Sequence, residues 1–280
     1  TLTNSYPGLL VLDPNTLDTK LTIPLPSLGV HIAPCVDGRH IWVALLDGSA
    51  ARIDLESKAI NLRFPLGSTP GRIWAIACPP QKPDSLVACF DPGTLGNSRI
   101  QLFERGVARS QTYKPPGLDI DSLPENVPLF SMTFTPDGRF FSSTLSHLRE
   151  LKLSPNGISE LRSLDTLSDP DSATVGSISN QLIYTTGTLI QLSSLVASKP
   201  FGTSPFVTGD RETSRFLATS NPEELLPSAY VASYNANPAS LQWRLSVSNY
   251  HTFGKTSTLL SMGTNGALLI SDSLRLLKTS

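Results

Sequence analysis

Residues 130–143 read Phe130-Ser-Met-Thr-Phe-Thr-Pro-Asp-Gly-Arg-Phe-Phe-Ser-Ser143, two short apolar runs on either side of a Pro-Asp-Gly turn. Alternation of apolar and polar residues on both sides of such a turn is typical of half-buried β-strands. The arrangement recurs in Val30-His-Ile-Ala-Pro-Cys-Val-Asp-Gly-Arg-His-Ile-Trp-Val43, and again where Ile73–Cys78 is followed by Ser85–Phe90. The chain is therefore predicted to consist of repeated antiparallel hairpins.

The recurrence extends over most of the 280 residues and predicts an all-β fold, a β-propeller in which four-stranded sheets surround a central axis. Five complete four-stranded units are expected, over residues 29–66, 72–113, 130–164, 173–198 and 206–247. No long stretch has a helical period, so helices are expected to be short. We expect one propeller domain over residues 1–280, because this length suits one large all-β domain.

The two ends of the chain each supply only part of a sheet. Gly8–Asp13 and Thr19–Leu25 are predicted to be outer strands, and Thr258–Met262 and Ala267–Ser271 to be inner strands. Pairing the N-terminal strands with the C-terminal sheet would close the ring and remove exposed strand edges. This solution favours six blades. Leu274–Lys278 is a competing third strand, so seven blades are the alternative.

A family resemblance supports this fold. The N-terminal segment contains Gly8-Leu-Leu-Val-Leu-Asp-Pro-Asn-Thr16 and Thr22-Ile-Pro-Leu25, and it resembles the YVTN-type repeat. The turns at Asp37-Gly38 and Pro136-Asp137-Gly138 look like the hairpin of the same repeat. The chain thus broadly resembles the YVTN and WD40-like propeller superfamily. The resemblance implies blades and not chemistry, and it departs from the WD40 pattern because no tryptophan is followed by aspartate.

Composition excludes several classes of function. The formal net charge is -1, and charged residues make up 16%, against roughly 25% in an average globular protein. No Lys/Arg run is present, so we expect no nucleic-acid partner. No apolar run approaches the roughly 18 residues of a membrane span. The chain begins with Thr1 and not with Met, which leaves room for an upstream targeting segment, so compartment and oligomeric state stay open.

Two long connections are predicted to form a binding face. In propellers, the connection from an outer strand to the next inner strand and the connection from second to third strand lie on the same face. Residues 114–128 form a connection of the first kind and residues 221–228 one of the second kind, and long connections are often functional. Their acidic residues are Asp119, Asp121, Glu125, Glu223 and Glu224. The alternative is that both are solvated loops.

Five further residues are assigned to the same face. His31, on an inner strand, and His147, in a second-to-third-strand turn, are expected to reach the mouth of the central channel; a structural role is the alternative for each. Asp47 and Asp91 each follow a second strand, as Asp272 does, and the three either cap turns or together form an acidic ring that could receive a basic partner. Arg72 is the first residue of the predicted inner strand Arg72–Cys78 and completes the set of candidate binding residues.

These residues favour binding over catalysis. The four histidines have no metal-ligand spacing, so no metal site and no cofactor are expected. Calcium-dependent propeller lactonases need an Asn and an Asp at positions that Phe130 and Leu145 occupy here. We expect a non-catalytic scaffold for a protein or peptide. The alternatives are a hydrolase or lactonase with a metal at the funnel mouth, and a propeller that binds small ligands or glycans.

The three cysteines are too few for a disulfide framework. Cys78 and Cys89 lie on the two arms of one predicted hairpin and are a candidate disulfide pair. The alternative is that both are small buried hydrophobic residues.

Overall fold

The computed structural model describes residues 7–13, 15–67, 72–92, 98–116, 130–144, 147–167, 175–185, 188–198, 207–210, 215–219, 229–236, 239–247, 258–261, 266–270 and 274–278. Apart from a single 3-10 turn at Asp165–Leu167, the regular structure of these residues is β-strand. The strands form antiparallel meanders in which consecutive strands pair. This is the arrangement that the repeated hairpins predict.

Five of the sheets have four strands. The first contains β3 (Gly29–Pro34), β4 (His40–Leu45), β5 (Ser49–Asp54) and β6 (Ala59–Pro65). The second contains β7 (Ile73–Ala77), β8 (Ser85–Phe90), β9 (Arg99–Glu104) and β10 (Val107–Ala108). The third contains β11 (Phe130–Phe134), β12 (Phe140–Thr144), β13 (Leu148–Ser154) and β14 (Gly157–Ser163). The fourth contains β15 (Val175–Ser179), β16 (Leu182–Thr185), β17 (Thr188–Gln191) and β18 (Val196–Ser198), and the fifth contains β19 (Val207–Asp210), β20 (Arg215–Thr219), β21 (Ala229–Ala236) and β22 (Ala239–Val247).

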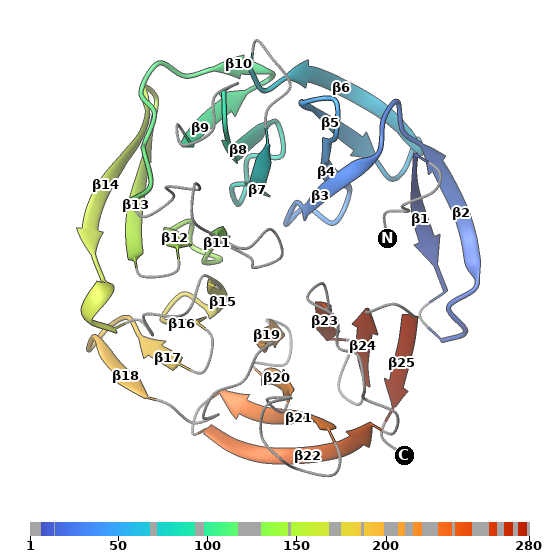
Figure 1. Cartoon of the computed structure of the whole chain (residues 1–280), viewed down its shortest axis with the longest axis vertical. Helices are drawn as coiled ribbons and strands as arrows, with labels where there is room; N and C mark the ends of the chain where they lie inside the picture. Colours follow the sequence, from blue (N-terminus) through green and yellow to red (C-terminus); the bar gives the residue numbers. More distant parts are fainter. Residues whose placement is uncertain are drawn as a thin grey trace.

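The sheets stand around a common centre, and the first strand of each four-stranded sheet is the innermost (Figure 1). Inner strands of consecutive sheets touch, as β3 does with β7 and β7 with β11. The hairpin of β1 (Gly8–Leu12) and β2 (Thr19–Pro24) stands beside the first sheet (Figure 1). A three-stranded sheet of β23 (Thr258–Ser261), β24 (Gly266–Ile270) and β25 (Leu274–Lys278) follows the fifth sheet.

The apolar core is divided into layers between neighbouring sheets. Trp42 and Phe64 of the first sheet pack with Phe90 and Phe103 of the second. Further layers join the second sheet to the third, the third to the fourth, and the fourth to the fifth. The second, third and fourth sheets are therefore covered on both faces, which explains why β8 of the second sheet is buried along its whole length.

The N-terminal hairpin uses the same kind of packing. Leu9 and Ile23 are buried against Val43 and Ile53 of the first sheet. In the C-terminal sheet β25 pairs with β24 and so takes the third position, which the N-terminal strands were expected to fill. Among the described residues the strand partner of β1 is β2. The number of blades and the closure of the ring through this hairpin stay predictions.

The outer part of the second sheet, predicted over residues 107–113, contacts both its own sheet and the third sheet. Strand β10 ends at Ala108, and the following segment crosses to the third sheet. There the Gln111 amide donates to the Asn156 carbonyl at 2.8 Å, and the Ile158 amide donates to the Gln111 carbonyl at 3.1 Å. The segment also stays paired with its own sheet, because the Ile100 amide donates to the Tyr113 carbonyl at 2.7 Å and the Tyr113 amide donates to the Ile100 carbonyl at 3.0 Å. It therefore ties the two sheets together.

The candidate disulfide between Cys78 and Cys89 was wrong. Cys78 is bonded to Cys35, with the two Cα atoms 5.3 Å apart, and Cys89 is a buried free thiol. The strand register explains the difference, because Cys89 faces Ala75 in the β7–β8 pair, while Cys35 and Cys78 follow the inner strands β3 and β7 directly. The bridge therefore links neighbouring sheets and not two strands of one hairpin.

Candidate functional site

Strand register brings three parts of the second sheet to one edge. Ile73 at the start of β7 faces Phe90 at the end of β8, and Phe90 faces Arg99 at the start of β9. The Asp91 amide donates to the Arg72 carbonyl at 2.9 Å and fixes this edge. The residues before an inner strand and those between second and third strands therefore share one edge of the sheet, which we call the Arg72 edge.

A cavity of about 340 Å³ lies against the inner strands β3, β7 and β11. The side chains that matter most for its chemistry are His31, Arg72, Trp74, Phe130, Ser131 and Met132. They come from three consecutive sheets, which meet at the centre of the ring (Figure 1). The cavity combines one cation with aromatic and sulfur-containing side chains, which is a common composition for recognition sites.

Arg72 provides the positive charge of the cavity. Its guanidinium carbon lies 4.1 Å from the centroid of the Trp74 ring, within the range of a cation–π interaction. The residue is exposed, and within the described part of the chain it has no carboxylate partner. Stacking restricts the side chain while its N–H donors stay open to a ligand.

The Trp74 ring supports the Arg72 side chain that lies over it. The ring is buried in the layer between the second and third sheets, next to Ile100 and Phe134. The indole Nε1 is buried and has no hydrogen-bond partner among the residues that the structure describes. Arg72 directly precedes β7, and the strand register shifts between Ile73 and Ala75, so the contact between the guanidinium and the Trp74 ring, and not regular strand alternation, brings the two side chains together.

His31 lines the cavity as a neutral group. Its Nε2 lies 2.9 Å from the Ile73 carbonyl oxygen, so this nitrogen carries the proton and donates. Burial lowers the pKa of His31 below its usual value, and the nearby charge of Arg72 acts in the same direction. The ring therefore links β3 to β7 and leaves the positive charge at the cavity to Arg72.

The two aspartates do not face this cavity. Asp47 accepts hydrogen bonds from the Ser49 amide at 3.0 Å and the Ser49 hydroxyl at 2.6 Å, and it pairs with Arg63 at 2.6 Å. Asp91 is only 2% exposed and accepts a hydrogen bond from the Ser98 hydroxyl. These contacts fit the turn-capping alternative, and Asp272, the third aspartate of the predicted acidic ring, lies outside the described residues.

His147 lies on the third sheet and away from the cavity lining. Its Nδ1 is 3.7 Å from a carboxylate oxygen of Asp165, which also accepts a hydrogen bond from the Leu148 amide at 2.7 Å. Of the candidate residues, the structure thus brings His31 and Arg72 together. The acidic candidates of the two long connections, Asp119, Asp121, Glu125, Glu223 and Glu224, lie outside the described residues.

Comparison with known proteins identifies the fold. No family model matches the chain, and no curated protein matches it. Among solved structures, a chain of the "Crystal Structure of Mitotic Checkpoint Complex" is similar over 98% of this chain and 84% of its own length, with a TM-score of 0.68 and 11% identity. The Cps50 (Swd1) β-propeller domain from Myceliophteria thermophila is similar over 98% and 91%, with a TM-score of 0.67 and 9% identity. The chain has a β-propeller fold.

The predicted propeller is confirmed by this similarity and by the four-stranded sheets. In this propeller, reasoning from the sequence found two cavity residues and missed the aromatic and Met132 side chains beside them. The available signal was the period-2 spacing of Arg72 with Trp74 and of Phe130 with Met132 on inner strands.

The described part of the propeller lacks a cluster of metal-binding side chains and a helix suited to span a membrane. No group of three or more His, Cys, Asp or Glu side chains there is placed to hold a metal ion. None of the helices described is both long enough and apolar enough to span a membrane.

Proposed function

We propose that this propeller is a non-catalytic scaffold that binds a protein or peptide at the mouth of its central cavity. The observation that supports the proposal is an exposed Arg72 held over Trp74, beside the apolar side chains of Phe130 and Met132. A charged donor next to an apolar wall suits a peptide segment with one acidic and one apolar side chain. Aromatic residues, Met and Arg are also enriched in protein interfaces.

Arg72 is the main recognition group in this proposal. A guanidinium presents several N–H donors in a fixed plane and pairs with carboxylates through two parallel hydrogen bonds. Its stacking on Trp74 limits the side-chain freedom that would be lost on binding. The lack of a carboxylate partner among the described residues means that no internal ion pair has to break first.

The two acidic connections are part of the proposed binding face. Strand β20 ends at Thr219 and β21 begins at Ala229, so the connection between them starts and ends where second strands turn into third strands. In the second sheet the turn from second to third strand begins at the edge that carries Arg72, which supports this part of the proposal. Acidic side chains of residues 114–128 and 221–228 would then receive basic groups of the partner at the rim.

Panning of a displayed peptide library on the native protein tests the proposal. Selected peptides should carry an acidic residue next to an apolar one, and they should bind the Arg72→Glu variant at least about tenfold more weakly, or about 1.4 kcal/mol. The matched control is Lys152→Glu, which makes the same charge change at an exposed position on β13. Equal loss in both variants, or no enrichment of acidic peptides, would contradict the proposal.

Deletion of residues 119–125 tests the contribution of the acidic connection. If this segment only contributes to the binding face, its removal should leave the melting temperature nearly unchanged and weaken capture of the selected partner. Thermal unfolding and binding are measured on the same preparation. A large loss of melting temperature would instead assign the segment to packing of the propeller.

A further inference from the structure

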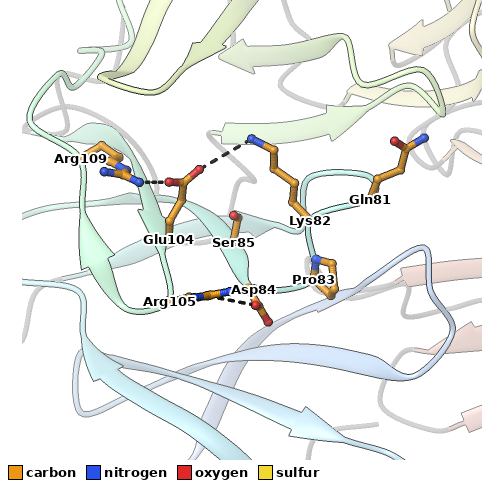
Figure 2. A pocket seen from close by; sticks show the side chains of 8 residues that line it. All are labelled: Gln81, Lys82, Pro83, Asp84, Ser85, Glu104, Arg105 and Arg109. Carbon is orange, nitrogen blue, oxygen red and sulfur yellow. Dashed lines mark hydrogen bonds and ion pairs between the residues drawn. The ribbon is translucent and has the colours of Figure 1, made fainter.

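A second hollow lies at the opposite edge of the second sheet, away from the Arg72 edge. It has a volume of about 440 Å³ and is formed by the turn that enters β8 and the turn that joins β9 to β10 (Figure 2). Its charged side chains are Lys82, Asp84, Glu104, Arg105 and Arg109. We call it the Lys82 hollow.

Positively charged side chains at the Lys82 hollow outnumber the carboxylates that pair with them. Glu104 pairs with Lys82 at 3.7 Å and also with Arg109 (Figure 2). Asp84 pairs with Arg105 at 3.4 Å and also with Arg52 of the neighbouring sheet. Each carboxylate is therefore shared by two cations, and the surroundings of the hollow carry two positive charges in excess. The whole chain has a formal net charge of -1, so this excess is local.

The two carboxylates stay ionised under ordinary conditions. The hydrogen bond from Arg52 lowers the pKa of Asp84, and the hydrogen bond from Arg109 lowers the pKa of Glu104. Their charges are thus already included in the excess of two. A bound group with two negative charges would balance the site.

A hydroxyl group is also available in the hollow. Ser85 is only 4% exposed, and within the described residues its hydroxyl makes no hydrogen bond. Figure 2 shows this hydroxyl pointing into the space between Glu104 and Lys82. Lys82 and Arg105 are 62% and 83% exposed, so both side chains are free to turn towards a ligand. Ammonium, guanidinium and hydroxyl groups all donate hydrogen bonds that phosphate oxygens accept.

An exposed apolar side chain stands opposite Glu104, one of the residues that line the hollow. Val107 is 64% exposed and faces Glu104 across the β9–β10 pair. A charged hollow with an apolar side chain next to it suits a phosphate that is attached to a chain with side chains of its own. A free inorganic ion would make no use of Val107.

We propose that the Lys82 hollow binds a phosphorylated serine or threonine of a peptide segment of a partner protein. Lys82, Arg105 and the Ser85 hydroxyl hold the phosphate, and Val107 contacts an apolar side chain next to it in the peptide. The site is separate from the cavity of the proposed function, because the two lie at opposite edges of the second sheet. Arg72→Glu should therefore leave phosphopeptide binding unchanged.

Fluorescence anisotropy with three labelled peptides tests this site. The peptides carry phosphoserine, serine or glutamate at one position, with leucine beside it. The phosphoserine peptide should bind at least about tenfold more tightly than the serine peptide, because a phosphate carries about two negative charges at pH 7. Equal binding of the phosphoserine and serine peptides would overturn the proposal.

Two variants locate the site. Lys82→Glu should weaken binding of the phosphopeptide by at least about tenfold. Its matched control is Lys58→Glu, the same charge change in an exposed turn at the same edge of the first sheet. Ser85→Ala, which removes only the hydroxyl, should weaken binding without a change in net charge. Equal weakening by Lys82→Glu and Lys58→Glu would overturn the assignment.

Competition with inorganic phosphate separates the two sources of the anion. If the peptide contributes contacts through Val107, free phosphate should displace the phosphopeptide only at concentrations at least about tenfold above those of unlabelled phosphopeptide. Displacement by phosphate at the same concentration as the peptide would show an ion site and would overturn the peptide partner.

Discussion

At the scale of single residues, Gly157 is the position where a side chain is least tolerable. Its backbone φ is 138°, and a Cβ atom added there would lie 1.9 Å from the Gln111 carbonyl oxygen, which accepts the hydrogen bond that ties the second sheet to the third. Gly157→Ala must therefore move the backbone of this contact. We expect the free energy of unfolding to fall by about 3 kcal/mol, measured by urea denaturation.

Gly38 is the matched control for Gly157. It also has a positive φ, 66°, but a Cβ atom there would meet nothing within 4 Å. Gly38→Ala should cost only the left-handed backbone penalty, about 1 kcal/mol. Equal losses for the two variants would show that the contact between Gln111 and Gly157 does not form in solution.

The Asp54 carboxylate should make the free energy of unfolding depend on pH in the acidic range. The Arg39 guanidinium, whose Nη2 lies 2.6 Å from Asp54 Oδ2, lowers the pKa of Asp54 to about 2. The pKa of an Asp side chain in the unfolded chain is about 3.9. The contribution of the Asp54–Arg39 contact to the free energy of unfolding is therefore fully present above that pH and disappears as the pH falls towards about 2. The stability difference between the native protein and Asp54→Asn should shrink over this range.

Urea midpoints of both proteins between neutral pH and about pH 2 measure this difference. Asp18→Asn is the control, since Asp18 is exposed and has no ion pair among the described residues. A gap between the native protein and Asp54→Asn that stays constant with pH would contradict the role of the Arg39 contact.

At the scale of strands and sheets, the sequence pattern predicts the strands and turns within a sheet better than it predicts the contacts between sheets. Strand β12 lies where the alternation around Pro136-Asp137-Gly138 places it, because strand and turn preferences are local. The crossing at Gln111 and the bond between Cys35 and Cys78 have no such signal, since each depends on how two sheets face each other. The same reason explains the site: the position of Arg72 was predictable, but the wall that Phe130 and Met132 add to it was not.

The disulfide should stabilise the junction of the first two sheets. It closes a segment with a sequence separation of 43 residues, for which the loss of unfolded-chain entropy predicts about 4 kcal/mol. A reductant should lower the urea midpoint of the native protein but not that of a Cys35→Ala/Cys78→Ala variant. Alkylation of the unfolded protein without reductant should modify Cys89 alone. Three alkylated cysteines would contradict the bond.

At the scale of the whole molecule, stability depends on a succession of layers between sheets. Each layer is formed by side chains of two neighbours, such as Tyr184 of the fourth sheet, which packs edge-on against Phe216 of the fifth. In this arrangement an open end leaves one face of a sheet without cover. Whether the N-terminal hairpin closes the ring therefore decides how a local defect spreads.

Ile23→Ala tests closure of the ring. Ile23 is buried between the hairpin and the first sheet, and its truncation should cost about 2–5 kcal/mol where the cavity cannot collapse. If the hairpin also joins the C-terminal sheet, loosening it opens the ring on both sides. Hydrogen exchange measured by mass spectrometry should then accelerate in β4 and β5 and also in β23–β25, whereas Val36→Ala, at an exposed position, should change neither. Faster exchange in β4 and β5 alone would mean that the hairpin covers the first sheet without closing the ring.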